Sequence, residues 1–299
     1  MDHKDLTIGI VFLLQSTVGI VGNFSILSCY LIHYCTEQTL KTTNLILTHM
    51  LTTNSLIILS KGLLYIMRAF GVEGFISDFG CEFLLYIERL GRNMSIGTTC
   101  FLSVFQAITI TPVNSFWVCL KVKASKHISL FTSLCWIYYM SINMVFPLYK
   151  YTKRNSNNQT HKSGMKYCST SGHDDISRSL YTAFFVLPEV LFSVIIVWSS
   201  TSMIIILYRH KQQVQHIRST NVSSRTSPES KATHRIMALV FTFIGFYALS
   251  SILQGCIALI YNPGWWLMDI TAIISLCFPT LGHFVVSYNS QYQCSAFQE

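Results

Sequence analysis

The sequence predicts an all-helical membrane protein in which seven helices cross the bilayer as one bundle. Two observations lead to this prediction. Hydrophobic residues make up 51% of the 299 residues and charged residues only 11%, whereas a soluble domain is about 25% charged. The apolar residues also fall into seven runs, each close to or longer than the ~20 residues that a helix needs to cross the hydrocarbon core. Lipid is therefore the expected main solvent of this chain.

The seven runs follow one another along the chain and form one domain. The first begins almost at once, with no cleavage site before it, so we expect it to act as its own insertion signal. Most gaps are short, but 150–179 and 209–235 are long and polar, and we expect them to be the second outer loop and the third inner loop. The predicted spans cover residues 6–32, 40–67, 81–111, 128–149, 180–208, 236–261 and 265–288.

Charged residues inside the second and third spans indicate a hydrated interior. A charge at the centre of a bilayer costs roughly 2.5–3.5 kcal/mol on insertion scales, so Lys61 and the charges of the third span should face protein or water. Lys61 could instead extend along the helix to the outer headgroups, and for Arg68 this extension is the expected arrangement. In the third span, Glu88 and Arg92 are four residues apart and share a face, on which they can pair.

These intramembrane charges are the predicted ligand-binding groups. Glu189 follows Pro188 in the outer half of the fifth span. A small amphiphilic ligand would be oriented by charged groups and packed against aromatic rings. The alternative is a salt bridge between Glu189 and one of the two arginines that never touches ligand. The candidate binding residues are Glu88, Arg89, Arg92, Glu189, Phe185 and Tyr247.

Other polar residues in the spans, Asn23, Asn44, His49 and Asn54, are predicted to form hydrogen bonds between helices. No catalytic set, metal-ligand spacing or phosphate-binding glycine loop is visible, so neither an enzyme nor a cofactor is expected. The chain has a net charge of +8. Because the basic residues lie mainly between the apolar runs, they indicate an anionic membrane surface and not nucleic acid.

Two cysteines and a glycosylation sequon indicate the orientation of the bundle in the membrane more clearly than the distribution of basic residues does. With the amino terminus outside, Cys81 and Cys168 both face the oxidising side and can form a disulfide. Asn158 begins a sequon in the long outer loop, although Asn221 begins a rival sequon in the long inner loop.

The inner basic groups either contact a G protein or only set topology and touch anionic lipid. They include Lys121, Lys123, Arg209 and Lys211.

Several stretches resemble vomeronasal type-1 receptors, in the same order and with the same spacing. The most specific is the third helix, GRNMSIGTTCFLSVFQAITI at 91–110. The others are LKVKA at 120–124, LYRHKQQVQHI at 207–217, SPE at 227–229, FYALSSI at 246–252 and CFPT at 277–280. Like that family, the chain lacks the acidic–Arg–Tyr motif of the third helix and the Asn-Pro-x-x-Tyr motif of the seventh, which mark rhodopsin-like receptors.

The resemblance implies a multi-pass receptor of the plasma membrane that binds a small pheromone-like molecule and activates a heterotrimeric G protein of the Gi/Go type. It also implies the Cys81–Cys168 disulfide and a glycan at Asn158. Two alternatives stay open at this point. A bitter-taste-like receptor is separated only by the motifs above, and the charges inside the second and third helices would also suit a small-solute transporter or channel. The absence of repeated halves argues against the latter.

Overall fold

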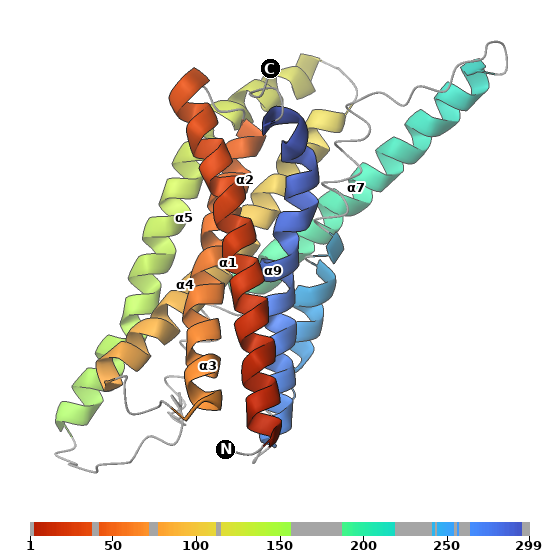
Figure 1. Ribbon diagram of the computed structural model, residues 1–299. Coiled ribbons are helices and arrows are strands. Elements are labelled where there is room, and N and C mark those ends of the chain that lie inside the picture. Colours follow the sequence, from red (N-terminus) through yellow and green to blue (C-terminus); the bar gives the residue numbers. More distant parts are fainter. Residues whose placement is uncertain are drawn as a thin grey trace.

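The computed structural model describes residues 3–37, 42–71, 77–111, 115–156, 187–218, 241–242, 244–253, 256 and 264–294. These residues form helices that stand side by side in one bundle (Figure 1). Among them, five helical spans are long and apolar enough to cross a membrane, and two shorter apolar helices, Ile244–Leu253 and Trp266–Gly282, bring the number to seven. The predicted all-helical, seven-helix fold is confirmed.

The helices extend beyond the apolar runs, because helical hydrogen bonding continues past the edge of a bilayer core. The second span is continuous but changes type: a π-helical segment, η1, separates α2 from α3. The sixth helix is the segment Ile244–Leu253. The helices are α1 (His3–Glu37), α2 (Thr42–Ile57), η1 (Ile58–Gly62), α3 (Leu63–Ala69), α4 (Asp78–Ile110), α5 (Ser115–Ser156), α7 (Leu187–Arg218) and α9 (Trp265–Cys294).

Helix α1 begins at one end of the bundle and α9 finishes at the other (Figure 1), as an odd number of crossings requires. We call the end at which α1 begins the outer end, following the topology expected from the sequence. At this end Ser77 caps α4, since its hydroxyl accepts a hydrogen bond from the Gly80 amide at 3.2 Å. Cys81, one turn further on, is buried and disulfide-bonded. Its predicted partner, Cys168, lies outside the described residues.

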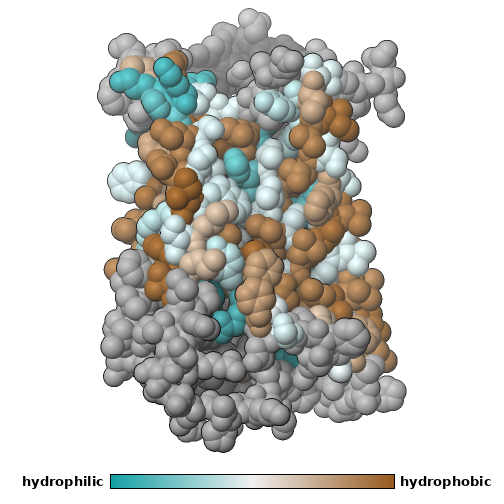
Figure 2. Space-filling model, turned by 90° about the vertical axis from the view of Figure 1, so that its left-hand side faces the viewer, coloured by the Kyte–Doolittle hydropathy of each residue, from teal (hydrophilic) through white to brown (hydrophobic). Residues whose placement is uncertain are grey.

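Helix α4 is the centre of the bundle. Of its most apolar 18-residue stretch, 67% is buried, compared with 22% in α1, α5 and α7. Met94, Ile96 and Leu102 of α4 are fully enclosed. The outward faces of α1, α5 and α7 are instead lined with exposed leucine, isoleucine and valine. Figure 2 shows such hydrophobic side chains, in brown, across much of one face, as expected of a surface that contacts lipid tails.

The contact between α1 and its neighbours depends on close approach and on polar side chains. A Cβ atom on Gly62 would collide with the hydroxyl of Ser16, so glycine lets η1 lie this close to α1 without moving that side chain. Asn23 donates from Nδ2 to the Pro279 carbonyl at 2.9 Å, and Gln15 donates to the Ile273 carbonyl at 3.1 Å. In a membrane, such hydrogen bonds and close packing supply the attraction between helices.

The predicted hydrogen bonds between helices are confirmed for two residues. Asn23 joins α1 to α9, and His49 of α2 accepts a long hydrogen bond from Trp136 of α5 at 3.4 Å. Asn54 differs from this prediction, because neither of its amide atoms has a hydrogen-bond partner in the described part of the chain. The amide nitrogen of Asn44 likewise has none there.

Candidate ligand-binding site

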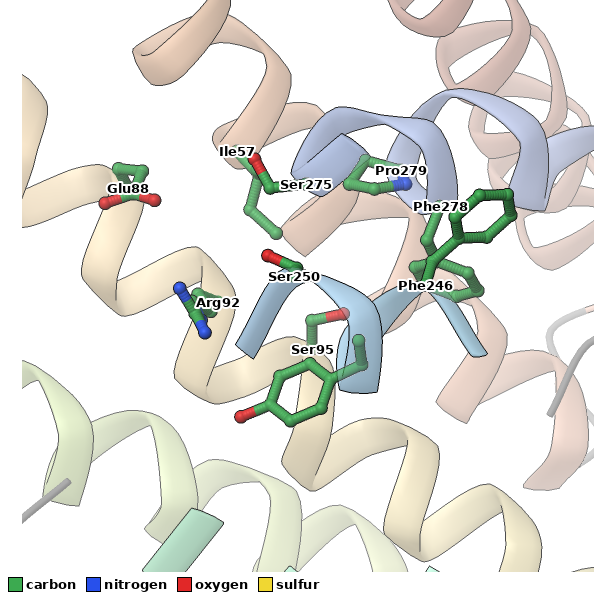
Figure 3. Close-up of a pocket in the computed structure, with 10 residues that line it drawn as sticks. Ile57, Glu88, Arg92, Ser95, Phe246, Ser250, Ser275, Phe278 and Pro279 are labelled. Carbon is green, nitrogen blue, oxygen red and sulfur yellow. The ribbon is translucent and has the colours of Figure 1, made fainter. Parts of the chain in front are cut away.

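A cavity of about 40 Å³ lies in the outer half of the bundle, between α2, α4, the sixth helix and α9. Figure 3 shows Glu88 and Arg92 on successive turns of one helix, with Ile57, Ser250 and Ser275 across the gap. The cavity combines two charges, serine hydroxyls and aromatic rings. Its lining residues are Ile57, Glu88, Arg92, Ser95, Phe246, Tyr247, Ser250, Ser275, Phe278 and Pro279.

Glu88 is held by a lysine from another helix. Lys61 Nζ lies 3.4 Å from Glu88 Oε1, and only 12% of the lysine side chain and 18% of the glutamate side chain are exposed. Lys61 belongs to the π-helical segment η1. Such a segment has wider turns than an α-helix and shifts the face on which the following residues lie. The prediction that Lys61 faces the protein is confirmed, and the alternative extension to the headgroups is wrong, because the side chain turns inward to an ion pair.

Arg92 brings three helices together. Its Nε lies 3.7 Å from Oε1 of Glu189 on α7, and its guanidinium lies 5.6 Å from the ring centroid of Tyr247 on the sixth helix. At 3.7 Å the contact with Glu189 is an ion pair and is too long for a strong hydrogen bond. Arg92 is one of the two arginines considered as partners of Glu189, and it makes this contact.

The structure assigns Glu88 and Arg92 to separate pairs. Their shared face on α4 is real, since both line the cavity. Each nevertheless meets its oppositely charged partner on a neighbouring helix, Lys61 in one case and Glu189 in the other. The wall of the cavity therefore has a negative and a positive group side by side, each already balanced by a second charge behind it.

A further ion pair lies nearer the outer end and includes a residue that the sequence analysis missed. Arg68 Nη1 contacts Asp269 Oδ1 at 3.0 Å, and only 8% of the aspartate side chain is exposed. The guanidinium also lies 5.9 Å from the ring of Tyr65, which stacks on Phe12. Arg68 therefore ties α3 to α9, and the expectation that it would reach the headgroups is wrong. An acidic residue within the last apolar run was the available signal for Asp269.

The remaining predicted residues fall into three groups. Arg89 is half-buried on α4 and does not line the cavity among the described residues. Lys121 and Lys123 are exposed near the inner start of α5, and Arg209 is exposed on the inner part of α7. Phe185 and Asn158 lie outside the described residues, as does the side chain of Lys211, whose backbone continues α7.

Comparison with known proteins identifies relatives over nearly the whole chain. The human vomeronasal type-1 receptor 4 is 44% identical over 286 residues, which cover 96% of this chain and 95% of that protein. The human vomeronasal type-1 receptor 2 is 46% identical over 92% of this chain and 69% of its own length. In Danio rerio, olfactory receptor class A-like protein 1 is 25% identical over 93% of this chain and 87% of that protein.

Among solved structures, squid rhodopsin has the same fold. The two structures superpose with a TM-score of 0.68, covering 96% of this chain and 78% of that one. Their sequences are only 14% identical, so this likeness concerns the fold of a G-protein-coupled receptor and no individual site residue.

The model of the vomeronasal organ pheromone receptor family matches residues 6–298. Together with the relatives above, this match decides between the alternatives left open by the sequence. The protein is a multi-pass receptor of the plasma membrane, and neither an enzyme, a transporter nor a bitter-taste receptor. The chain belongs to the vomeronasal organ pheromone receptor family.

Proposed function

We propose that the cavity between α2, α4, the sixth helix and α9 receives a small pheromone-like molecule, and that its occupation activates a heterotrimeric G protein of the Gi/Go type. The observation that supports this most is the pair of opposite charges, Glu88 and Arg92, on the wall of a cavity within the membrane-spanning bundle. Ionisable groups are costly at this depth and usually mark a functional site.

The chemistry of the lining favours a small amphiphile. Ser95 and Ser250 offer hydroxyls, Glu88 and Arg92 offer charges, and Phe278 offers an apolar ring. The volume of about 40 Å³ is small beside the roughly 300–1,000 Å³ of typical ligand pockets. The cavity as it stands therefore suits the polar head of a ligand, and a larger molecule would have to move lining side chains.

Arg92 connects the ligand cavity to two other helices, α7 and the sixth helix. A ligand group that interacts with Arg92 competes with Glu189 for the same guanidinium, and this changes the contact between α4 and α7. The same group would alter the approach of Tyr247 and with it the sixth helix. A ligand that binds better when these contacts are rearranged shifts the bundle toward that arrangement.

The inner ends of α5 and α7 supply the proposed contact with the G protein. Lys121, Lys123 and Arg209 are exposed there, and the same charges suit anionic lipid. Replacing Lys121 and Lys123 with alanine should reduce G-protein activation at a saturating ligand concentration, while ligand affinity stays nearly unchanged. If this variant activates the G protein as well as the wild type does, these lysines serve only to set the membrane topology and to contact anionic lipid.

The proposed function is tested by expressing the receptor with a promiscuous G protein and screening volatile and steroid-like compounds. For any active ligand, Glu189→Gln should shift the concentration–response curve at least severalfold with unchanged surface expression, because it removes the charge that balances Arg92. Arg89→Gln, on the same helix as Arg92 but away from the cavity, is the matched control and should respond as the wild type does. No response across the panel despite surface expression, or equal shifts in both variants, would contradict the proposal.

A further inference from the structure

Asn54 of α2 is a buried amide without a hydrogen-bond partner in the described part of the chain. The side chain is fully buried, with an exposed fraction of 0%. Neither Oδ1 nor Nδ2 has a hydrogen-bond partner among the described residues. An amide side chain has two N–H donors and an oxygen with two lone pairs. Burial of such a group without partners is costly, and lipid tails provide no substitute. A small polar molecule is the natural group to complete this site.

Two helices independently place Asn54 directly beneath the ligand cavity. On α2, Asn54 precedes the cavity-lining Ile57 by three residues and therefore shares its face. On α9, a Cβ atom at Gly282 would lie 3.6 Å from Asn54 Nδ2 and 3.6 Å from the ring of Phe278, which also lines the cavity. Because α2 runs outward and α9 runs inward, both relations put Asn54 about one turn deeper than the cavity floor.

Other hydrogen-bonding groups at this level also lack partners in the part of the chain that the structure describes. Asn23 is fully buried, and its Oδ1 has no partner there, while its Nδ2 holds the Pro279 carbonyl. Pro279 has no N–H, so the carbonyl of Ser275, four residues earlier, loses its helical donor. Ser275 itself lines the cavity. Acceptors from α1 and α9 thus accompany the amide of Asn54 around the proline of α9.

We propose that Asn54 forms a water-binding site beneath the ligand cavity, where one or more waters join its amide to the polar groups around Pro279. Asn54 and Asn23 are neutral, and the carboxylate of the cavity, Glu88, is held by Lys61. This set of groups favours water over a cation. The water site extends the polar wall of the cavity inward to Pro279, where α9 lacks a backbone hydrogen bond. A ligand in the cavity would therefore act on the inner half of α9 through these waters.

The first test compares two substitutions by thermal unfolding of the full-length receptor in lipid nanodiscs. Asn54→Leu keeps the branched shape and the number of side-chain heavy atoms but removes every hydrogen bond, so the remaining partners of the water become unsatisfied. We expect its apparent Tm to fall by several degrees. Asn54→Ser keeps a donor and an acceptor and leaves room for water, and its Tm should stay above that of Asn54→Leu. A Tm for Asn54→Leu above that of the wild type would overturn the proposal, since it would mean that the amide is buried dry.

The second test needs only the wild-type receptor and still decides the matter if Asn54→Leu does not fold. Hydroxyl radicals formed by a short X-ray pulse oxidise side chains that lie beside bound water. Met50 lies one turn inward of Asn54 on the same face, is 1% exposed and does not line the cavity. Met203 of α7 is 0% exposed and is the control.

Mass spectrometry should find Met50 oxidised severalfold faster than Met203. Equal rates for the two methionines would overturn the proposal. Neither test involves a ligand or a G protein, so failure of the water site is distinguishable from failure of the proposed receptor mechanism.

Discussion

The ion pair between Lys61 and Glu88 offers the most quantitative prediction from this structure. The two charged atoms are 3.4 Å apart, and both side chains are less than one-fifth exposed. At this separation their attraction is about 5 kcal/mol with an effective dielectric constant of about 20. The cost of removing both charges from water offsets most of that attraction. The pair as a whole therefore adds little stability, whereas one of its members alone is strongly destabilising.

Glu88→Gln leaves the lysine buried without its carboxylate and should destabilise the receptor by roughly 3 kcal/mol, as is typical when one partner of a buried pair is removed. By the usual scaling of stability with temperature, the apparent Tm should fall by about 6–12 °C. The double variant Lys61→Met with Glu88→Gln has no unpaired charge. It should therefore be more stable than Glu88→Gln alone.

The assay is thermal unfolding of the purified receptor in nanodiscs, with the four proteins of the double-mutant cycle measured side by side. A coupling between the two sites of at least about 1 kcal/mol is expected of residues in direct contact. The reasoning is refuted if Glu88→Gln melts within about 2 °C of the wild type, a shift well below the expected one. It is equally refuted if the double variant loses the sum of the two single losses.

Three further predictions concern other contacts between helices, all measured by the same unfolding assay. Asp269→Asn should lower stability by roughly 2–3 kcal/mol because Arg68 keeps its charge at a largely buried position; the reversed pair Arg68→Asp with Asp269→Arg should recover part of the loss, and no recovery would mean that the contact is not electrostatic. Asn23→Leu should cost about 1 kcal/mol through the lost hydrogen bond from α1 to α9, and an unchanged Tm would contradict that bond. Because the hydrogen bond from Trp136 to His49 is long at 3.4 Å, a double-mutant cycle of Trp136→Phe and His49→Phe should give a coupling below about 1 kcal/mol; a larger coupling would show that the bond is stronger than its length implies.

The sequence predicted the inward orientation of the charges but not their partners. The cost of a charge in lipid requires Glu88 and Arg92 to face the interior, and both do. Spacing along one helix also suggested that they pair with each other, since helix periodicity is the only geometry a single sequence provides. The distances from Glu88 to Lys61 and from Arg92 to Glu189 depend on how whole helices pack. No local pattern in the sequence encodes them.

Two other features depended on backbone geometry and on distant parts of the chain. The π-helical segment at Ile58–Gly62 contains no proline and no strong signal other than its glycine, so nothing in the local sequence indicated the wider helical turn at which Lys61 pairs with Glu88. Arg68 lies near the end of an apolar run, where extension to the headgroups is the ordinary expectation. Its partner Asp269 is 201 residues further along the chain, and only the packing of α3 against α9 brings them together.

The most direct test of the central claim is nucleotide exchange on a purified Gi heterotrimer by the reconstituted receptor and a ligand from the screen. The wild type should accelerate exchange in a ligand-dependent way. Arg92→Gln should shift the half-maximal ligand concentration by an order of magnitude or more, while Arg89→Gln, on the same helix but outside the cavity lining, should leave it nearly unchanged. If Arg92→Gln responds like the wild type, or if both variants shift equally, the cavity bordered by Glu88 and Arg92 is not the place where ligand acts.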